Sequence, residues 1–92
     1  MNTDLENFIK EYMQEPLLQL DSDIIIEDDL GISGDDAYDF IVLFSKQFGV
    51  NISNFKFDKY FYSEPSLFLS WKKRTPLTLG LLEEAIKEKT LK

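Results

Sequence analysis

Of the side chains in this sequence, the carboxylates are the ones whose number and spacing suggest a chemical function. Eight acidic residues and no basic residue fall between Asp21 and Asp39. The sequence contains neither cysteine nor histidine, so it lacks a thiol nucleophile and the commonest general base and transition-metal ligand. Its carboxylates would therefore have to act as metal ligands, as an acid and base pair, or as fixed charges that bind a cationic partner.

The spacing of the acids favours the third use. They lack the Asp-x-Asp-x-Asp-Gly order with a closing Glu that forms a calcium-binding loop. A hydrolase with paired carboxylates needs two acids of separated pKa facing a cleft, and a chain of 92 residues leaves little room for one. We therefore expect a protein that is not an enzyme and that binds no metal or cofactor.

The charge is unevenly distributed along the chain. Residues 1–50 hold 12 acidic and 2 basic side chains, whereas residues 51–92 hold 5 acidic and 8 basic ones. The acidic half repels phosphate backbones and attracts basic surfaces, so we expect a partner protein with a basic surface and no nucleic acid. The cluster Trp71-Lys72-Lys73-Arg74 has only three basic residues, which is a weak signal for nucleic-acid binding. It is better explained as an intramolecular counterpart to the acidic half or as a solvated turn. The simpler alternative is that the acids only keep the protein in solution.

Length and composition predict one small domain spanning residues 1–92, because 43% of the residues are hydrophobic and two cores would not fit. The N-terminus has no basic stretch leading into an apolar run, and no run approaches the roughly 20 residues that cross a bilayer. We expect a cytoplasmic protein that does not enter membranes. Its oligomeric state is left open.

Helical spacing predicts a first helix at about residues 4–15. Its apolar stripe consists of Leu5, Phe8, Ile9, Tyr12 and Met13. Thr3 and Glu6 have the spacing of a capping box, and Pro16 cannot continue the helix. Residues 17–30 are predicted as a connection in which the β-branched run at residues 24–26 forms a short extended segment.

A second helix is predicted from near Gly34 to Phe48, with Gly49 as its stop. Its apolar face consists of Ala37, Phe40, Ile41, Phe44 and Phe48. Ser33 and Asp36 have capping-box spacing, with Asp in place of the usual Glu or Gln. Asp35 and Asp36 would place negative charge at the positive end of the helix dipole.

The second half of the chain predicts one further long helix. Thr75-Pro76 or Thr78 can open it, and Leu79, Leu82 and Ile86 form its apolar face. Between the two halves, residues 50–71 are rich in aromatic side chains and are predicted to form a short helix or turn that adds core area. The expected fold is thus mainly all-α, a small bundle of three main helices plus a short irregular or helical segment.

The sequence resembles a family of small uncharacterised bacterial proteins that is itself similar to acyl carrier proteins. The resemblance rests on Asp28-Asp29-Leu30-Gly31, on Gly34-Asp35-Asp36-Ala37 and on the apolar positions that follow them. Carrier proteins show Asp-Leu-Gly, two further residues, and then a Ser that opens a helix and holds phosphopantetheine. In this sequence the position of that Ser is occupied by Gly34, which has no hydroxyl to modify.

The resemblance implies an acyl-carrier-like bundle that docks on partners without a tethered arm. Asp36 and Asp39 occupy the positions where carriers have acids that meet basic patches on partner enzymes. Asp35 stands where carriers usually have Leu. The predicted partner-binding residues are therefore Asp35, Asp36 and Asp39.

Two other functions stay open at this point. The chain is a true carrier if phosphopantetheine is attached at Ser33, one residue before the expected position. It is a structural subunit or a homo-oligomer if the aromatic middle leaves a large apolar patch exposed.

Overall fold

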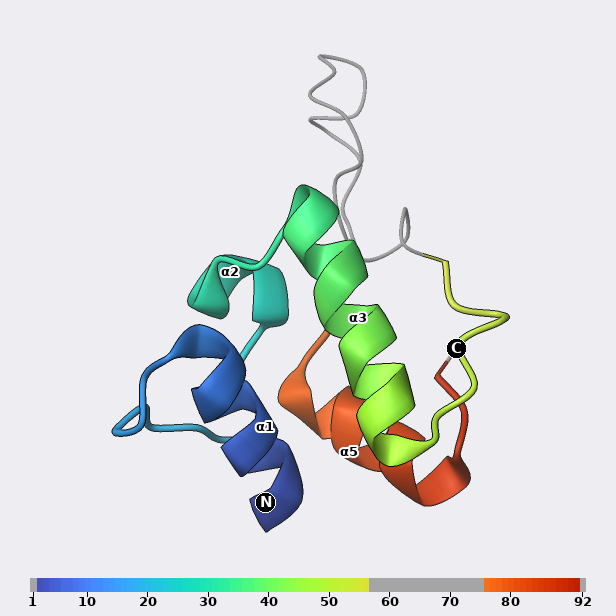
Figure 1. The fold of residues 1–92 in the computed structure, drawn as a ribbon, viewed down its shortest axis with the longest axis horizontal. Coiled ribbons are helices and arrows are strands. Elements are labelled where there is room, and N and C mark those ends of the chain that lie inside the picture. The colour runs from blue at the N-terminus through green and yellow to red at the C-terminus, as the bar shows by residue number, and fades with distance from the viewer. Residues whose placement is uncertain (1, 57–75, 92) are drawn as a thin grey trace.

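The computed structural model describes residues 2–56 and 76–91, and this part of the chain is mainly helical. Its helices are α1 (Thr3–Met13), α2 (Ile26–Leu30), α3 (Gly34–Phe48) and α5 (Leu79–Glu88). Helices α1 and α3 lie alongside each other, α2 lies near the start of α3, and α5 packs across the lower half of α3 (Figure 1). The predicted all-α fold class is confirmed. The expectations for residues 57–75, including the basic cluster and the rest of the aromatic middle, lie outside the described residues.

Helix α1 begins one residue earlier than the predicted capping box. Its N-cap is Asn2, whose Oδ1 accepts a hydrogen bond from the Leu5 N–H at 3.1 Å. The prediction of Thr3 as the cap was wrong because Asn2, an equally good capping residue, already supplies the acceptor. Gln14 ends the helix in a left-handed conformation with φ of 56°, two residues before Pro16.

The segment before α2 is extended as predicted and pairs with the segment before α5. Ile25 and Thr78 form an isolated antiparallel bridge. On either side of it the Ile26 N–H donates to Leu77 O at 2.9 Å, and the Leu79 N–H donates to Ile24 O at 3.0 Å. This short pairing joins two parts of the chain that are far apart in sequence.

Helix α2 itself was not predicted, because residues 17–30 were expected to form only a connection. The third Ile of the run, Ile26, is fully buried and opens the helix. The Asp29 carboxylate reaches back to accept the Ile25 N–H at 2.8 Å, so a side chain satisfies an amide at the helix start. Acids in its first turn also suit the positive end of the helix.

Helix α5 begins at the second of its two predicted starts. Thr78 is its N-cap and accepts a hydrogen bond from the Leu81 N–H at 3.3 Å. After α5 the chain runs parallel to the segment that follows α3. There the Asn51 N–H donates to Lys89 O and the Leu91 N–H donates to Asn51 O, both at 2.9 Å.

The core is apolar, and among the described residues no buried polar or charged residue interrupts it. Aromatic rings fill the contact between α1 and α3. The Phe8 ring centroid lies 5.5 Å from Phe40, 6.4 Å from Phe44 and 5.7 Å from Phe48, and Tyr12 lies 5.0 Å from Phe40. We call these five residues the α1–α3 seam. Each such ring pair contributes about 0.5–1.5 kcal/mol beyond the area that it buries.

The Glu83 carboxylate on α5 links three segments of the chain: the start of α1, the loop that contains Ser22, and α5 itself. Glu83 accepts a hydrogen bond from the Ser22 hydroxyl at 2.7 Å and another from the Asn2 N–H at 3.1 Å. The Ser22 bond lowers the pKa of Glu83 most, partial burial opposes this change, and the Asn2 amide and the charge of Lys87 lower it further. Glu83 therefore ties the start of α1 and the Ser22 loop to α5.

Candidate protein-interaction surface

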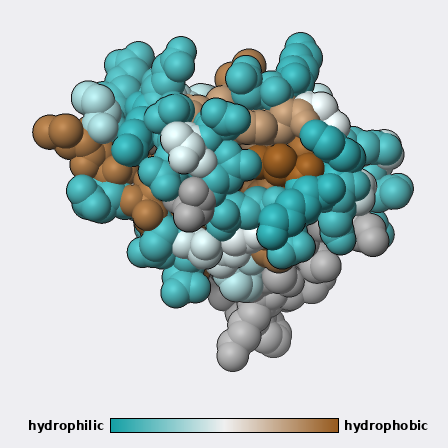
Figure 2. Space-filling view, turned by 90° about the horizontal axis from the view of Figure 1, so that it is seen from below, coloured by the Kyte–Doolittle hydropathy of each residue, from teal (hydrophilic) through white to brown (hydrophobic). Residues whose placement is uncertain are grey.

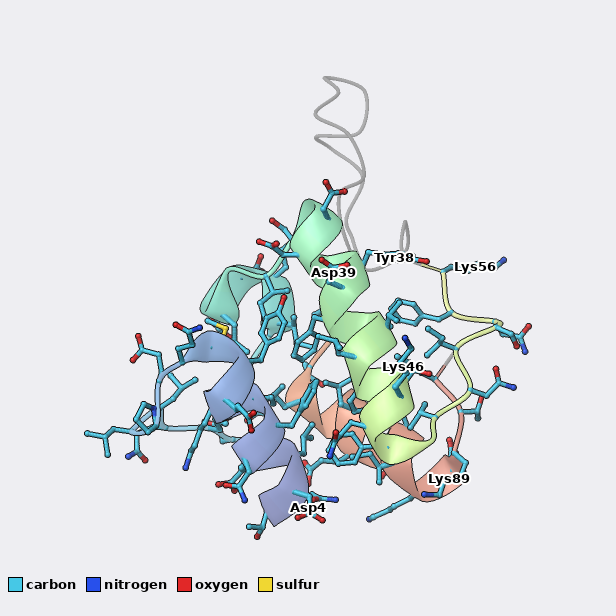
Figure 3. The ribbon with its side chains drawn as sticks, viewed as in Figure 1. Asp4, Tyr38, Asp39, Lys46, Lys56 and Lys89 are labelled. Atoms are coloured by element: carbon cyan, nitrogen blue, oxygen red, sulfur yellow. The ribbon has the colours of Figure 1, made fainter. Side chains whose placement is uncertain are left out.

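The three predicted partner-binding residues lie together at the start of α3. Asp35, Asp36 and Asp39 are all exposed and fall within the first two turns. Figure 3 shows Asp39 near the upper end of this helix, with its carboxylate directed away from the helix axis. Within residues 2–56 and 76–91 the ion pair found is Lys10 with Glu6, at 3.9 Å, and no described cation pairs with these three acids. We call Asp35, Asp36 and Asp39 the acidic face.

Gly34 is the first residue of α3 and has a left-handed backbone, with φ of 59°. No atom beyond its neighbours lies within 4 Å of the place where a Cβ would stand. Space alone would therefore admit a side chain, but the backbone conformation disfavours one by about 1–2 kcal/mol. Glycine is therefore favoured at position 34 by the backbone conformation. This is separate from the point that glycine has no hydroxyl to modify.

Ser33 is the N-cap of α3 by position, but its side chain makes no capping hydrogen bond. The predicted capping box of Ser33 and Asp36 was therefore wrong. A capping side chain ordinarily accepts from the second or third amide of the helix, and the left-handed Gly34 that follows Ser33 departs from the regular helix start. Ser33 is exposed.

The residues before α3 have structural roles that explain the Asp-Leu-Gly sequence. Asp29 accepts the Ile25 N–H, as described above, and Leu30 packs partly against the core. Gly31 ends α2 in a left-handed conformation, with φ of 71°, and its N–H donates to Glu27 O at 3.1 Å. This turn delivers the chain to the start of α3, so the motif positions the acidic face.

Tyr12 is a neighbour of the acidic face that the sequence did not reveal. Its hydroxyl donates to the backbone carbonyl of Asp36 at 3.2 Å. Burial raises the pKa of Tyr12 most, and the charges of Asp36 and Asp39 raise it further. The sequence signal was slight: Tyr12 is the member of the α1 apolar stripe that carries a polar tip. Through this tip α1 supports the first turn of α3.

A groove of about 520 Å³ runs between α1 and α3. It is lined by Asp4, Asn7, Phe8, Glu11, Tyr12, Leu43, Gln47 and Phe48. Its lining combines four apolar or aromatic side chains, Phe8, Tyr12, Leu43 and Phe48, with four polar or charged ones. Seen from below, the surface of the molecule is largely hydrophilic, with a hydrophobic patch near its centre (Figure 2).

In the part of the chain that the structure describes, no three acids are grouped so as to hold a metal ion. In the same residues no helix combines the length and the apolar character that crossing a bilayer requires.

Comparison with known families identifies the group to which the chain belongs. Residues 2–90 match the family model described as a protein of unknown function, DUF1493. The chain belongs to the DUF1493 family. No curated protein and no solved structure matches it. The DUF1493 match confirms membership of an uncharacterised family and includes all four described helices, whereas the likeness to acyl carrier proteins stays a prediction.

The left-handed start of α3 gives the first testable prediction. Replacing Gly34→Ala should lower the free energy of unfolding by about 1–2 kcal/mol because a Cβ disfavours positive φ. Gly34→Asn should cost about half as much, since Asn tolerates this conformation better. Ser33→Ala should change stability by less than about 0.5 kcal/mol because Ser33 makes no capping bond. Urea unfolding measures all three, and a neutral Gly34→Ala would contradict the assigned conformation.

Proposed function

We propose that the chain is a non-catalytic, acyl-carrier-like interaction module that docks α3 on a basic surface of a partner protein. The observation that carries this proposal is the acidic face, in which three exposed carboxylates stand within two turns of one helix. The described part of the chain supplies no cation that pairs with them. A basic partner would therefore meet these charges without first displacing a described internal ion pair.

The likeness to carrier proteins gives the proposal its orientation. Asp36 and Asp39 occupy the positions of the acids with which carriers meet basic patches, and Gly34 occupies the position of the modified Ser. The left-handed backbone at Gly34 supports a helix start that is built around glycine. The proposed module accordingly keeps the docking helix of a carrier and has no attachment point at that position.

The small free energy of exposed ion pairs suggests that the acidic face mainly speeds and orients the approach of the partner. Ion pairs between exposed side chains contribute about 0–1 kcal/mol each, because the charges are well hydrated before they meet. Complementary charges accelerate association and orient the partner more than they add affinity. Three carboxylates therefore account for selection of a basic partner, while most of the affinity must come from apolar contact elsewhere.

The docking proposal predicts a specific loss of partner binding. Changing Asp35→Asn, Asp36→Asn and Asp39→Asn together should reduce capture of co-purifying proteins from the native cells by about tenfold, since three rim pairs are lost. Binding should also depend less on salt. Quantitative mass spectrometry of tagged protein purified at low and high salt makes the measurement.

A control with the same net charge separates a local effect from a general one. The changes Glu15→Gln, Glu84→Gln and Glu88→Gln remove three exposed acids elsewhere on the chain. They should leave capture nearly unchanged. An equal loss in both triple variants, or no loss in the first, would show that the acidic face has been misassigned.

One observation favours a second function, a true carrier with phosphopantetheine at Ser33. Ser33 is exposed and its hydroxyl makes no capping bond. Intact-mass measurement after co-expression with a broad-range phosphopantetheinyl transferase decides between the two functions. The docking proposal expects an unmodified protein, whereas a mass increase that disappears in Ser33→Ala would establish the carrier.

A further inference from the structure

We propose that the α1–α3 groove receives an amphipathic, basic helix of the partner protein. This inference rests on the proposed function and extends it, because it assigns the apolar contact that the acidic face lacks. The groove adjoins the acidic face through Tyr12, which lines the groove and donates to the first turn of α3. One partner can therefore engage both surfaces together.

The groove offers apolar surface that the fold leaves uncovered. Phe8, Tyr12 and Phe48 line it and are only partly buried. Leu43 stands on its α3 side with 46% of its surface exposed, among the most exposed large apolar residues of the described chain. A partner's apolar side chain placed between Leu43 and Phe8 would remove this surface from water, which stabilises a complex by about 25 cal/mol per Å² buried.

The rings beneath the groove are held in place before any partner arrives. Phe8 contacts three rings of α3, and Phe44 and Phe48 lie 5.3 Å apart. Each ring is therefore fixed by neighbours within the α1–α3 seam. Binding to such a preformed surface loses little side-chain entropy.

The charges around the groove select a cationic occupant. Asp4 and Glu11 line the α1 side, and Asp36 and Asp39 act on Tyr12 at one end. The described lining contains no lysine or arginine. Figure 3 shows Lys56 and Lys89 beyond α3 on the side away from α1, and Lys46 in front of the lower half of α3. Basic side chains flanking an apolar stripe would complement this rim.

The shape of the groove fits a helix. The lining runs along α1 from Asp4 to Tyr12, about 12 Å at 1.5 Å per residue. Two to three turns of a partner helix would place anchors at i, i+3 or i+4 and i+7 along this length. Small-molecule sites enclose most of their ligand, whereas this groove is only partly enclosed and is lined by charged as well as apolar side chains.

A second copy of the chain fits the groove poorly. Residues 1–50 hold 12 acids and 2 bases, so two copies of this half repel each other. Among the described helices, α1, α2 and α3 are acidic at their starts, and α5 exposes Glu84 and Glu88 beside Lys87. None of them presents a basic face.

The test uses a synthetic helical peptide as the probe. The peptide is about four turns long, is cross-linked to hold its helix, and has Leu at i, i+3, i+4 and i+7 with Lys at the remaining positions. Two control peptides carry Glu in place of Lys, or the same composition in scrambled order. Amide shifts of the full chain in NMR locate the contact, and fluorescence anisotropy gives the Kd.

The matched variants are Leu43→Asn in the groove and Leu81→Asn on α5, where Leu81 is 39% exposed. Leu43→Asn should weaken binding of the Leu/Lys peptide about tenfold, as expected for loss of one apolar anchor. Leu81→Asn should change the Kd by less than about twofold, since it alters an exposed Leu elsewhere. The amide shifts should concentrate at residues 7–12 and 36–48, and both control peptides should bind at least about tenfold more weakly.

The outcomes separate this inference from the docking proposal. Equal effects of Leu43→Asn and Leu81→Asn, or shifts that avoid α1, would overturn the groove assignment while leaving the acidic face to be judged by its own triple variant. If Leu43→Asn weakens binding but the Asp35, Asp36 and Asp39 variant does not, the groove is correct and the acidic face is wrong. Absence of any binding by the Leu/Lys peptide overturns the helix as the occupant.

Discussion

The packing of Phe8 from α1 against three phenylalanines of α3 is the contact on which the rest of the molecule depends. Its ring pairs, at centroid distances of 5.5–6.4 Å, set how the two helices pack against each other, because protein interiors are close-packed. Tyr12 continues the same packing by one turn and carries it to Asp36. The positions of the groove and of the acidic face therefore both depend on how α1 packs against α3.

Concentrating carboxylates at one corner raises the problem of like-charge repulsion, which the helix start relieves. Asp35 and Asp36 stand at the positive end of α3, where a carboxylate is stabilised by about 0.3–1 kcal/mol. The Asp29 carboxylate instead accepts a hydrogen bond from the N–H of Ile25, the N-cap residue of α2. The left-handed glycines Gly31, which ends α2, and Gly34, which begins α3, redirect the chain between the two helices.

The sequence predicted the parts of this fold that repeat. The apolar stripes of α1, α3 and α5 extend over about two to three turns, which is enough to define a helical period, and all three helices are confirmed. Helix α2 is only five residues long and begins at the last of three β-branched residues, so the sequence pattern did not indicate a helix there. Two capping predictions were wrong for local reasons: Asn2 caps α1 in place of Thr3, and Ser33, which precedes the left-handed Gly34, makes no capping bond. The prediction that Thr78 can open α5 is confirmed.

The site was harder to predict from the sequence than the helices. Helical spacing alone places Asp35, Asp36 and Asp39 together on one helix, and the structure exposes all three, whereas their role in partner binding stays a prediction. The groove and the role of Tyr12 depend on how α1 meets α3, a contact between residues 24 or more positions apart that no local pattern encodes. Their function stays a prediction that rests on charge and shape.

The most direct test of this arrangement is the pKa of Tyr12, measured by NMR with carbon-labelled tyrosine and assigned with Tyr12→Phe. Burial and the nearby carboxylates should hold this pKa above the ordinary tyrosine value of about 10. Changing Asp36→Asn and Asp39→Asn should lower it, because the phenolate then meets less negative charge. A Tyr12 pKa near the ordinary value that is unaffected by the two substitutions would contradict the placement of Tyr12 beside the acidic face. It would also contradict the inference that the groove and the acidic face form one continuous surface.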